Sequence, residues 1–211
     1  MYSIIILCAG QGKRTGLNYN KMFYKFNNQT VYQMTLEPFL YDQNCGQIIV
    51  VTQESEREDF KELCQDARIE FVNGGQERQD SVFHGLQVVK YDNVMIHDGA
   101  RPYMKQELIN ALLKALKIHK ACLLMVPCKD TIKKVIDGKI IETYDRSTLM
   151  QAQTPQAFHK DIIIDAYQKG IDAHYQATDD AQMVEMFTEE EVYAVIGDYE
   201  NKKITTFEDL S

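Results

Sequence analysis

The sequence predicts an α/β protein built on a mostly parallel sheet with helices on both faces. Short apolar runs alternate along the chain with amphipathic segments, and this order repeats. Four of the runs are continuous in apolar residues apart from the leading Gln47 and Asn93, as in strands that are buried on both faces: residues 4–7, 47–51, 93–96 and 122–126. Strands that alternate with helices in this way are typical of βαβ units.

Apolar residues three and four positions apart predict helices between these strands. One stripe comprises Val82, Leu86 and Val89, and a second comprises Leu108, Leu112, Leu113 and Leu116. The run Thr178-Asp179-Asp180 predicts the start of a further helix, because Thr and Asp accept hydrogen bonds from the first N–H groups of a helix. We assign these apolar stripes to the core.

A hairpin and two late strands complete the predicted fold. Residues 130–136 and 139–144 flank Asp137-Gly138, a pair typical of two-residue hairpin turns. A lone hairpin is marginally stable in water, so we expect it to pack on another element such as a second subunit. Residues 192–196 and 203–207 predict two more strands. We therefore expect one domain over residues 1–211, with a protruding arm at about residues 129–150.

Composition excludes several classes of protein. The 211 residues carry 23 Lys+Arg and 31 Asp+Glu, a net charge of −8, which disfavours a nucleic-acid binder with a basic face. No apolar run approaches the roughly 18–20 residues of a membrane span, and the N-terminus lacks signal-peptide features. The five cysteines form no C-x-x-C pair, so we expect buried thiols in a reducing cytoplasm rather than zinc or disulfides.

Two glycine-rich segments are candidates for nucleotide binding. Residues 8–16 follow the first strand and carry Lys13 and Arg14, with Lys21 close behind, so they suit either phosphate binding or a tight turn with solvated cations. Their spacing matches neither a dinucleotide fingerprint, since Thr15 replaces the third glycine, nor a P-loop. Residues 74–81 could bring the Ser81 hydroxyl to a base, or form only a turn and a helix start.

A third segment, residues 97–102, places Asp98 at the end of a strand. That carboxylate could meet Mg²⁺ on a nucleotide while Arg101 binds phosphate, or it could cap the next segment and pair with Arg101. We assign His97 no role. No nucleophile–His arrangement or acid/base pair stands out, and the lysines and arginines around glycine-rich loops favour nucleotidyl or phosphoryl transfer.

Taken together, these segments resemble the 2-C-methyl-D-erythritol 4-phosphate cytidylyltransferase family of the non-mevalonate isoprenoid pathway. Further matches are D-T-I-K at residues 130–133, a polar segment ending in Q-T-P-Q-A-F at residues 145–158, T-D-D-A at residues 178–181 and N-K-K-I-T at residues 201–205. The matching segments run in family order over nearly the whole chain.

The resemblance implies a fold and a reaction. The fold is a three-layer Rossmann-like nucleotidyltransferase fold, in a cytoplasmic homodimer whose hairpin arms complete each other's active sites. The reaction is attack by the phosphate of methylerythritol 4-phosphate on the α-phosphorus of CTP, with Mg²⁺ present and pyrophosphate released. A phosphate nucleophile is already an anion, which agrees with the missing acid/base pair.

The resemblance also implies roles for individual residues. Arg14 and Lys21 match cations that stabilise the pentacoordinate transition state, and Arg146 and Lys203 match those that position the sugar phosphate. We expect Asp98 near Mg²⁺, with direct contact left open. The other implied binding residues are Ala9, Gly10, Gly12, Gly75, Gln76 (through its backbone), Arg78, Ser81, Gly99, Arg101, Thr131 and Thr154, with Thr131 and Arg146 donated by the partner's arm.

Small departures from the family pattern occur at three places. Cys8 and Gly99 stand where alanine is common, and because both are small we expect the backbone path to survive. Lys202 adjoins Lys203, and we choose Lys203 because it directly precedes Ile-Thr as in the family.

Three other functions compete with this hypothesis. Ribitol-5-phosphate cytidylyltransferase of teichoic acid synthesis shares the first loop and Q-T-P-Q, but it tends to carry Ser-Val where this chain has Gly99-Ala100. A non-catalytic CTP-binding module is disfavoured by the number of candidate cations. An NAD-dependent oxidoreductase is disfavoured by the loop spacing, and because Glu37, near the distance expected of a ribose ligand, precedes Pro38 in a helical segment.

Overall fold

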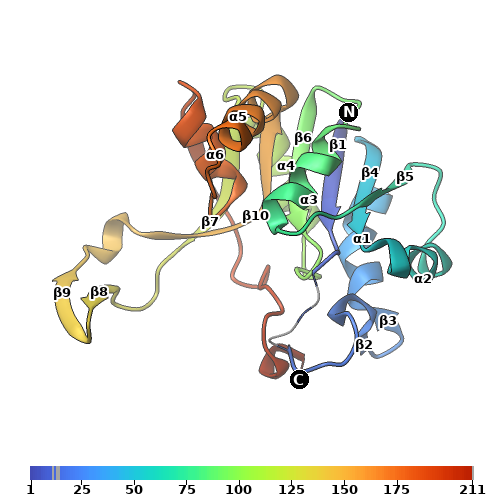
Figure 1. The fold of residues 1–211 in the computed structure, drawn as a ribbon, viewed down its shortest axis with the longest axis horizontal. Helices are drawn as coiled ribbons and strands as arrows, with labels where there is room; N and C mark the ends of the chain where they lie inside the picture. Colours follow the sequence, from blue (N-terminus) through green and yellow to red (C-terminus); the bar gives the residue numbers. More distant parts are fainter. Residues whose placement is uncertain (11, 13–14, 211) are drawn as a thin grey trace.

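A seven-stranded sheet forms the centre of the molecule in a computed structural model that describes residues 1–10, 12 and 15–210 (Figure 1). The strand order is β11-β7-β10-β6-β1-β4-β5. β10 pairs antiparallel with β6 and β7, and the other pairings in this sheet are parallel, as the sequence predicts. The bounds are β1 (Tyr2–Leu7), β4 (Cys45–Thr52), β5 (Ile69–Asn73), β6 (Asn93–Asp98), β7 (Ala121–Pro127), β10 (Met150–His159) and β11 (Val192–Ile196).

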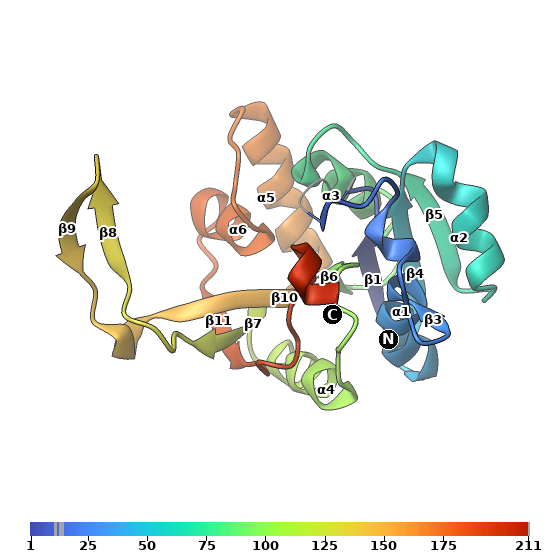
Figure 2. The ribbon, with the colours of Figure 1, turned by 90° about the horizontal axis from the view of Figure 1, so that it is seen from below.

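Helices cover both faces of the sheet, which confirms the three layers. Buried residues of α1 (Val31–Tyr41), α2 (Arg57–Leu63) and α4 (Gln106–Ala115) join one apolar cluster with Ile4 and Ile6. Those of α3 (Arg78–Leu86), α5 (Lys160–Asp172) and α6 (Asp180–Phe187) join a second cluster with Ile5. In Figure 2 the sheet separates α3 and α5 above from α4 below. Successive residues of β1 thus face opposite layers.

One strand, β10, has a polar sequence that does not predict a buried strand. β10 lies inside the sheet, yet the sequence indicates only a polar segment there. Its second half is buried, and the side-chain amides of Gln153 and Gln156 there donate to distant residues. Gln156, for example, donates to the Asp179 carboxylate and accepts from the Ala181 N–H. The strand therefore depends on contacts with distant residues that its own pattern does not reveal.

The predicted strand at residues 203–207 is wrong. This C-terminal segment, which we define as residues 198–210, crosses the ends of the strands and finishes in the 3-10 helix η5 (Phe207–Leu210). Ile204 is fully buried and its N–H donates to the Ala100 carbonyl, while its two neighbours are half-buried. The alternation in the sequence therefore reflects a segment anchored on the core rather than a sheet strand. Similarly, Val89 is buried but lies beyond the end of α3.

The predicted hairpin is present and projects from the body of the molecule (Figures 1 and 2). β8 (Lys133–Ile136) and β9 (Lys139–Thr143) form a separate two-stranded sheet, followed by η4 (Arg146–Thr148). Asp137 and Gly138 form the turn with positive φ angles of 48° and 75°, as Asp-Gly predicts. At the tip, Val135, Ile136, Ile140 and Ile141 are all 50–62% exposed.

The remaining elements are short. They are η2 (Lys21–Phe23), η3 (Glu54–Glu56) and the small β2 (Lys25–Phe26) and β3 (Gln29–Thr30) pair. Among the described residues, none of the helices has the length and apolar character that crossing a membrane requires.

Candidate active site

The candidate site is a cleft of about 540 Å³ at the carboxyl ends of β1 and β6. Ligands bind at this edge of open α/β sheets, because the strand ends and the loops that follow them converge there. The cleft brings together most of the residues that the sequence nominates: Ala9, Gly10, Gly12, Lys21, Gly75, Gln76, Arg78, Ser81, Asp98 and Lys203. Arg14, with Lys13, lies outside the described residues.

Two glycine-rich loops approach each other closely on one wall of the cleft. A Cβ atom at Gly74 would lie 2.5 Å from the Cβ of Ala9, and one at Gly75 would lie 2.1 Å from the Cβ of Asp80. The Ser81 hydroxyl accepts from the Gly75 N–H at 3.0 Å. This wall therefore requires glycine at both positions, and it presents backbone groups to the cleft, as expected where a nucleotide approaches the main chain closely.

Asp98 lies at the end of β6 between two cations. Its Oδ2 is 2.6 Å from the Lys203 Nζ, and its Oδ1 is 3.4 Å from the Arg78 Nε. Burial alone would raise the pKa of the Asp98 carboxyl, but Arg78 and Lys203 outweigh burial and hold that pKa well below its usual value. The site therefore contains a fixed, ionised carboxylate. The sequence also allowed an ion pair between Asp98 and Arg101, but among the described residues Asp98 pairs with Arg78 and Lys203 instead.

Arg78 is held from behind by a buried network that the sequence analysis missed. Its Nη1 and Nη2 donate to the two carboxylate oxygens of Asp180 at 2.9 and 2.8 Å. Asp180 is fully buried and also accepts from the Tyr167 hydroxyl at 2.6 Å. The one signal in the sequence was the acidic run at the start of α6, where Asp179 caps the helix as predicted. Arg78 is thus a rigid cation beside Asp98.

Lys21 also lines the cleft and begins η2, which Asn20 caps. The Asn20 side chain accepts from the Met22 N–H and donates to the Cys8 carbonyl and to Glu56. Lys21 Nζ donates to the Ile204 carbonyl at 2.8 Å. The C-terminal segment therefore carries Lys203 into the cleft and contacts Lys21 as well, whereas Lys202 lies over the ring of Tyr103.

Five predicted site residues are not among the described residues that line the cleft. The Thr154 hydroxyl accepts from the Asp98 N–H, and Arg101 Nη1 donates to the Asn201 carbonyl, so both lie behind the cleft. Thr131 and Arg146 are exposed on the arm, where Arg146 donates to the Lys129 carbonyl. Within one chain the structure therefore does not bring these four residues to the cleft. Gly99 also lies behind it, against Leu7 and Cys8.

The donor groups suit a cation that is bound mainly by its ligand. Among the described residues no cluster of three or more His, Cys, Asp or Glu side chains could hold a metal. Asp98 is a hard oxygen donor at the cleft, and Mg²⁺ commonly takes one or two carboxylates together with phosphate oxygens. Cys8, Cys45 and Cys122 are buried thiols, as predicted, whereas Cys64 and Cys128 are half-buried, and burial raises the pKa values of Cys45 and Cys122 to about 12.

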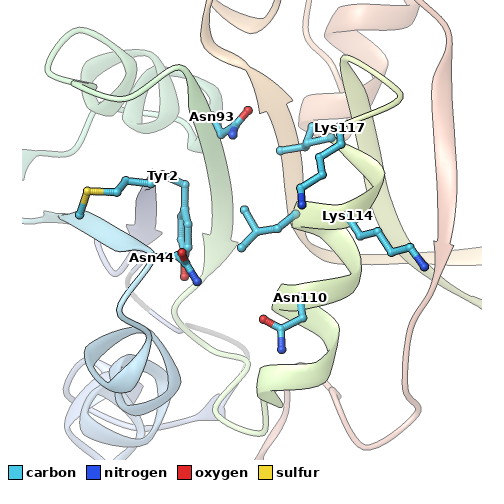
Figure 3. A pocket seen from close by; sticks show the side chains of 9 residues that line it. Tyr2, Asn44, Asn93, Asn110, Lys114 and Lys117 are labelled. Carbon is cyan, nitrogen blue, oxygen red and sulfur yellow. The ribbon is translucent and has the colours of Figure 1, made fainter.

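A second hollow, of about 330 Å³, lies at the opposite edge of the sheet. Figure 3 shows Tyr2, Asn44, Asn93 and Asn110 around it, with Lys114 near the end of α4 and Lys117 just beyond that helix. Of the sequence-predicted residues that the structure describes, none is among its lining residues. In the described part of the chain, the second hollow therefore contains none of the predicted chemistry.

Two of the three departures from the family pattern, Cys8 and Gly99, lie against each other. A Cβ at Gly99 would lie 2.8 Å from the Cys8 Sγ and 2.7 Å from the Leu7 carbonyl oxygen. We expect Gly99→Ala to lower the free energy of unfolding by about 1–3 kcal/mol through overpacking. Adding Cys8→Ala should recover part of that loss, because it removes the sulfur. Urea unfolding of the single and double variants tests this coupling, and strictly additive losses would disprove it.

Comparisons with known proteins agree with this geometry. The family model described as 2-C-methyl-D-erythritol 4-phosphate cytidylyltransferase matches residues 2–211. Proteins with that name from Bacillus cytotoxicus and Clostridioides difficile are 43% and 42% identical, cover all of this chain, and are themselves covered over 95% and 91% of their lengths.

Solved structures are similar over the same extent. The 4-diphosphocytidyl-2C-methyl-D-erythritol synthase of Anaerococcus prevotii matches with a TM-score of 0.87 and 33% identity, covering 99% of this chain and 94% of its own. The 2-C-methyl-D-erythritol 4-phosphate cytidylyltransferase of Francisella tularensis matches with a TM-score of 0.85 and 28% identity, and the match covers 100% of this chain and 97% of that one. Because sequence and fold agree from end to end, the chain belongs to the 2-C-methyl-D-erythritol 4-phosphate cytidylyltransferase family.

Proposed function

We propose that this chain transfers the cytidylyl group of CTP to 2-C-methyl-D-erythritol 4-phosphate in isoprenoid biosynthesis. The products are 4-diphosphocytidyl-2-C-methyl-D-erythritol and pyrophosphate. Family membership over residues 2–211 supports the substrates. The observation that carries the chemistry is the cleft that gathers two glycine-rich loops, Lys21 and Lys203 around the ionised Asp98.

The reaction needs charge stabilisation more than proton transfer. A phosphate oxygen of the polyol phosphate attacks the α-phosphorus of CTP and forms a new P–O bond. The bond from the α-phosphorus to the bridging oxygen breaks, and that oxygen leaves with pyrophosphate. Negative charge accumulates on the pentacoordinate centre, where we assign Lys21 and Arg14 to stabilise it. The attacking oxygen is already an anion, so no side chain has to remove a proton.

Lys203 is suited to hold the attacking phosphate. An ammonium group has three N–H donors, and the Lys203 Nζ uses one of them toward Asp98 Oδ2, at an N–O distance of 2.6 Å. The others can reach a substrate phosphate while Asp98 fixes the position of the lysine. Such positioning favours in-line attack, since a small displacement of a reactant lowers the rate strongly.

We also propose that the reaction uses Mg²⁺, with Asp98 as the protein residue beside it. Bound to the phosphates of CTP, the ion would neutralise charge on the triphosphate. The donor set supports this assignment, because one hard carboxylate at the cleft is enough for a cation that takes most of its ligands from phosphates and water.

A homodimer would explain the position of the arm. The arm that carries the exposed Thr131 and Arg146 projects from the body of the molecule, and the apolar side chains at the arm tip are exposed. We propose that the arm packs on a second copy and delivers Thr131 and Arg146 to that copy's cleft. This association would cover the apolar tip and add a cation to each site. The unpaired thiols favour a cytoplasmic location for the assembly.

Pyrophosphate release with CTP and Mg²⁺ tests the proposed function. We expect release with 2-C-methyl-D-erythritol 4-phosphate and none with ribitol 5-phosphate at equal concentration. Release with ribitol 5-phosphate alone would instead indicate an enzyme of teichoic acid synthesis. CTP binding without release in either reaction would indicate a non-catalytic nucleotide-binding protein and overturn the proposal.

Substitution of Lys21 should affect turnover more than CTP binding. Removing one group that stabilises the transition state typically lowers kcat by about 10²–10³, so we expect that loss in Lys21→Ala. The affinity for CTP should change by less than about threefold, since uniform binding is retained. Lys25→Ala, at an exposed lysine of β2, is the matched control and should retain activity. Equal losses in kcat and in CTP affinity would rule out the assigned role.

Mixing two inactive variants tests the shared site. Arg146→Ala and Lys21→Ala subunits should each be inactive as homodimers. Random exchange makes half of the dimers mixed, and each mixed dimer has one site with neither substitution, so about a quarter of the wild-type activity should return. A site made within one chain would recover nothing, and native mass spectrometry verifies that mixed dimers form.

A further inference from the structure

His97 is fully buried in β6 and adjoins three residues of the candidate site. Its Nδ1 lies 3.0 Å from the Thr154 hydroxyl, and its Nε2 lies 3.2 Å from the Arg101 carbonyl oxygen. Asp98 is its neighbour in sequence. The ring of Phe39 in α1 packs edge-on against the imidazole, with 5.6 Å between the centroids. Both ring nitrogens therefore face a polar group of the site.

The partners of His97 determine which nitrogen carries the proton. The Asp98 N–H donates to the Thr154 hydroxyl oxygen, so the hydroxyl proton can point to His97 Nδ1. The Arg101 carbonyl can only accept, so Nε2 must donate. These two bonds are satisfied together by the neutral ring protonated on Nε2.

We propose that neutral His97 is a positioning residue that holds Asp98, Thr154 and Arg101 in register for cytidylyl transfer, an inference that rests on the proposed function. Through Nδ1 it orients the Thr154 hydroxyl that receives the Asp98 N–H. Through Nε2 it holds the Arg101 carbonyl, one turn beyond Asp98. One ring thus fixes both ends of the segment that carries the central carboxylate.

The same contacts extend to the C-terminal segment. Arg101 Nη1 donates to the Asn201 carbonyl at 2.7 Å, and the Asn201 side chain donates to the Thr154 carbonyl at 2.9 Å. Asn201 lies two residues before Lys203. Loss of the His97 contacts would therefore loosen Asp98 and the base of the segment that brings Lys203 to it. Displacements of about 1 Å in such sites reduce rates by about 10²-fold.

Three substitutions at His97 test its hydrogen bonds to Thr154 and Arg101 separately. In His97→Asn the side-chain oxygen can replace Nδ1 and accept from Thr154. In His97→Gln the amide NH₂ can replace Nε2 and donate to Arg101. His97→Phe keeps the ring and removes both bonds. We expect His97→Phe to lower kcat about 100-fold, the two amide variants to retain intermediate activity, and KM for CTP to change by less than about threefold.

Matched controls distinguish positioning from folding. His159→Gln alters a histidine whose Nε2 contacts the Leu116 carbonyl away from the cleft, and its kcat should be unchanged. Thr154→Val removes the hydroxyl, and because it acts on the same chain of bonds, its loss and that of His97→Phe should be less than additive. Unchanged kcat per folded His97→Phe molecule would overturn the proposal. If that variant does not fold, unchanged kcat in both amide variants would overturn it.

A spectroscopic readout needs no turnover. In ¹⁵N NMR spectra of the full chain at pH 7, His97 should appear as the neutral ring protonated on Nε2, because its hydrogen bonds place a donor opposite Nδ1 and an acceptor opposite Nε2. A ring protonated on Nδ1, or a cation at pH 7, would overturn the assignment. If the wild-type chain shows the expected ring but releases no pyrophosphate with either polyol phosphate, the proposed function fails while the hydrogen-bond geometry stands. The two failures are therefore distinguishable.

Discussion

The carboxylate of Asp98, held between Arg78 and Lys203, is the interaction on which the rest of the site depends. A carboxylate this deeply buried is costly unless it is paired, so each cation must be held in place by other contacts. Arg78 meets this need through Asp180, which is itself buried and also bound by the Tyr167 hydroxyl. The charges of α3, α6 and β6 thus form one compensated network, and removing Arg78 would break the ion pair of the buried Asp180.

The contact of Lys203 with Asp98 explains the course of the C-terminal segment. If residues 203–207 added a strand to an edge of the sheet, Lys203 would lie away from Asp98. Instead the segment crosses the strand ends, where Ile204 enters the core and its carbonyl accepts from Lys21. The C-terminal segment therefore positions Lys203 and contacts Lys21. An acidic protein with a net charge of −8 can in this way present a locally basic cleft to an anionic nucleotide.

Local patterns predicted much of the fold and the site. Continuous apolar runs located the inner parallel strands, Asp137-Gly138 located the hairpin turn, and the glycine-rich loops with Asp98 located the cleft. Features that depend on distant partners were not predicted. The polar sequence of β10 does not indicate that its amides are buried, and Asp180 was assigned only to a helix start because the sequence does not show its ion pair with Arg78. His97 has no role in the sequence analysis for the same reason, since its two partners lie 57 residues downstream and on the following loop.

Hydrogen exchange at the Ile204 amide tests most directly whether the Asp98 charge anchors this architecture. That N–H donates to the Ala100 carbonyl, next to the carboxylate that holds Lys203. In Asp98→Asn we expect its exchange to accelerate at least about tenfold, while amides in the β1–β4 pairing keep their wild-type rates. Unchanged protection of Ile204 in a folded Asp98→Asn protein would show that the segment is held independently of Asp98, and would contradict the central role of this carboxylate.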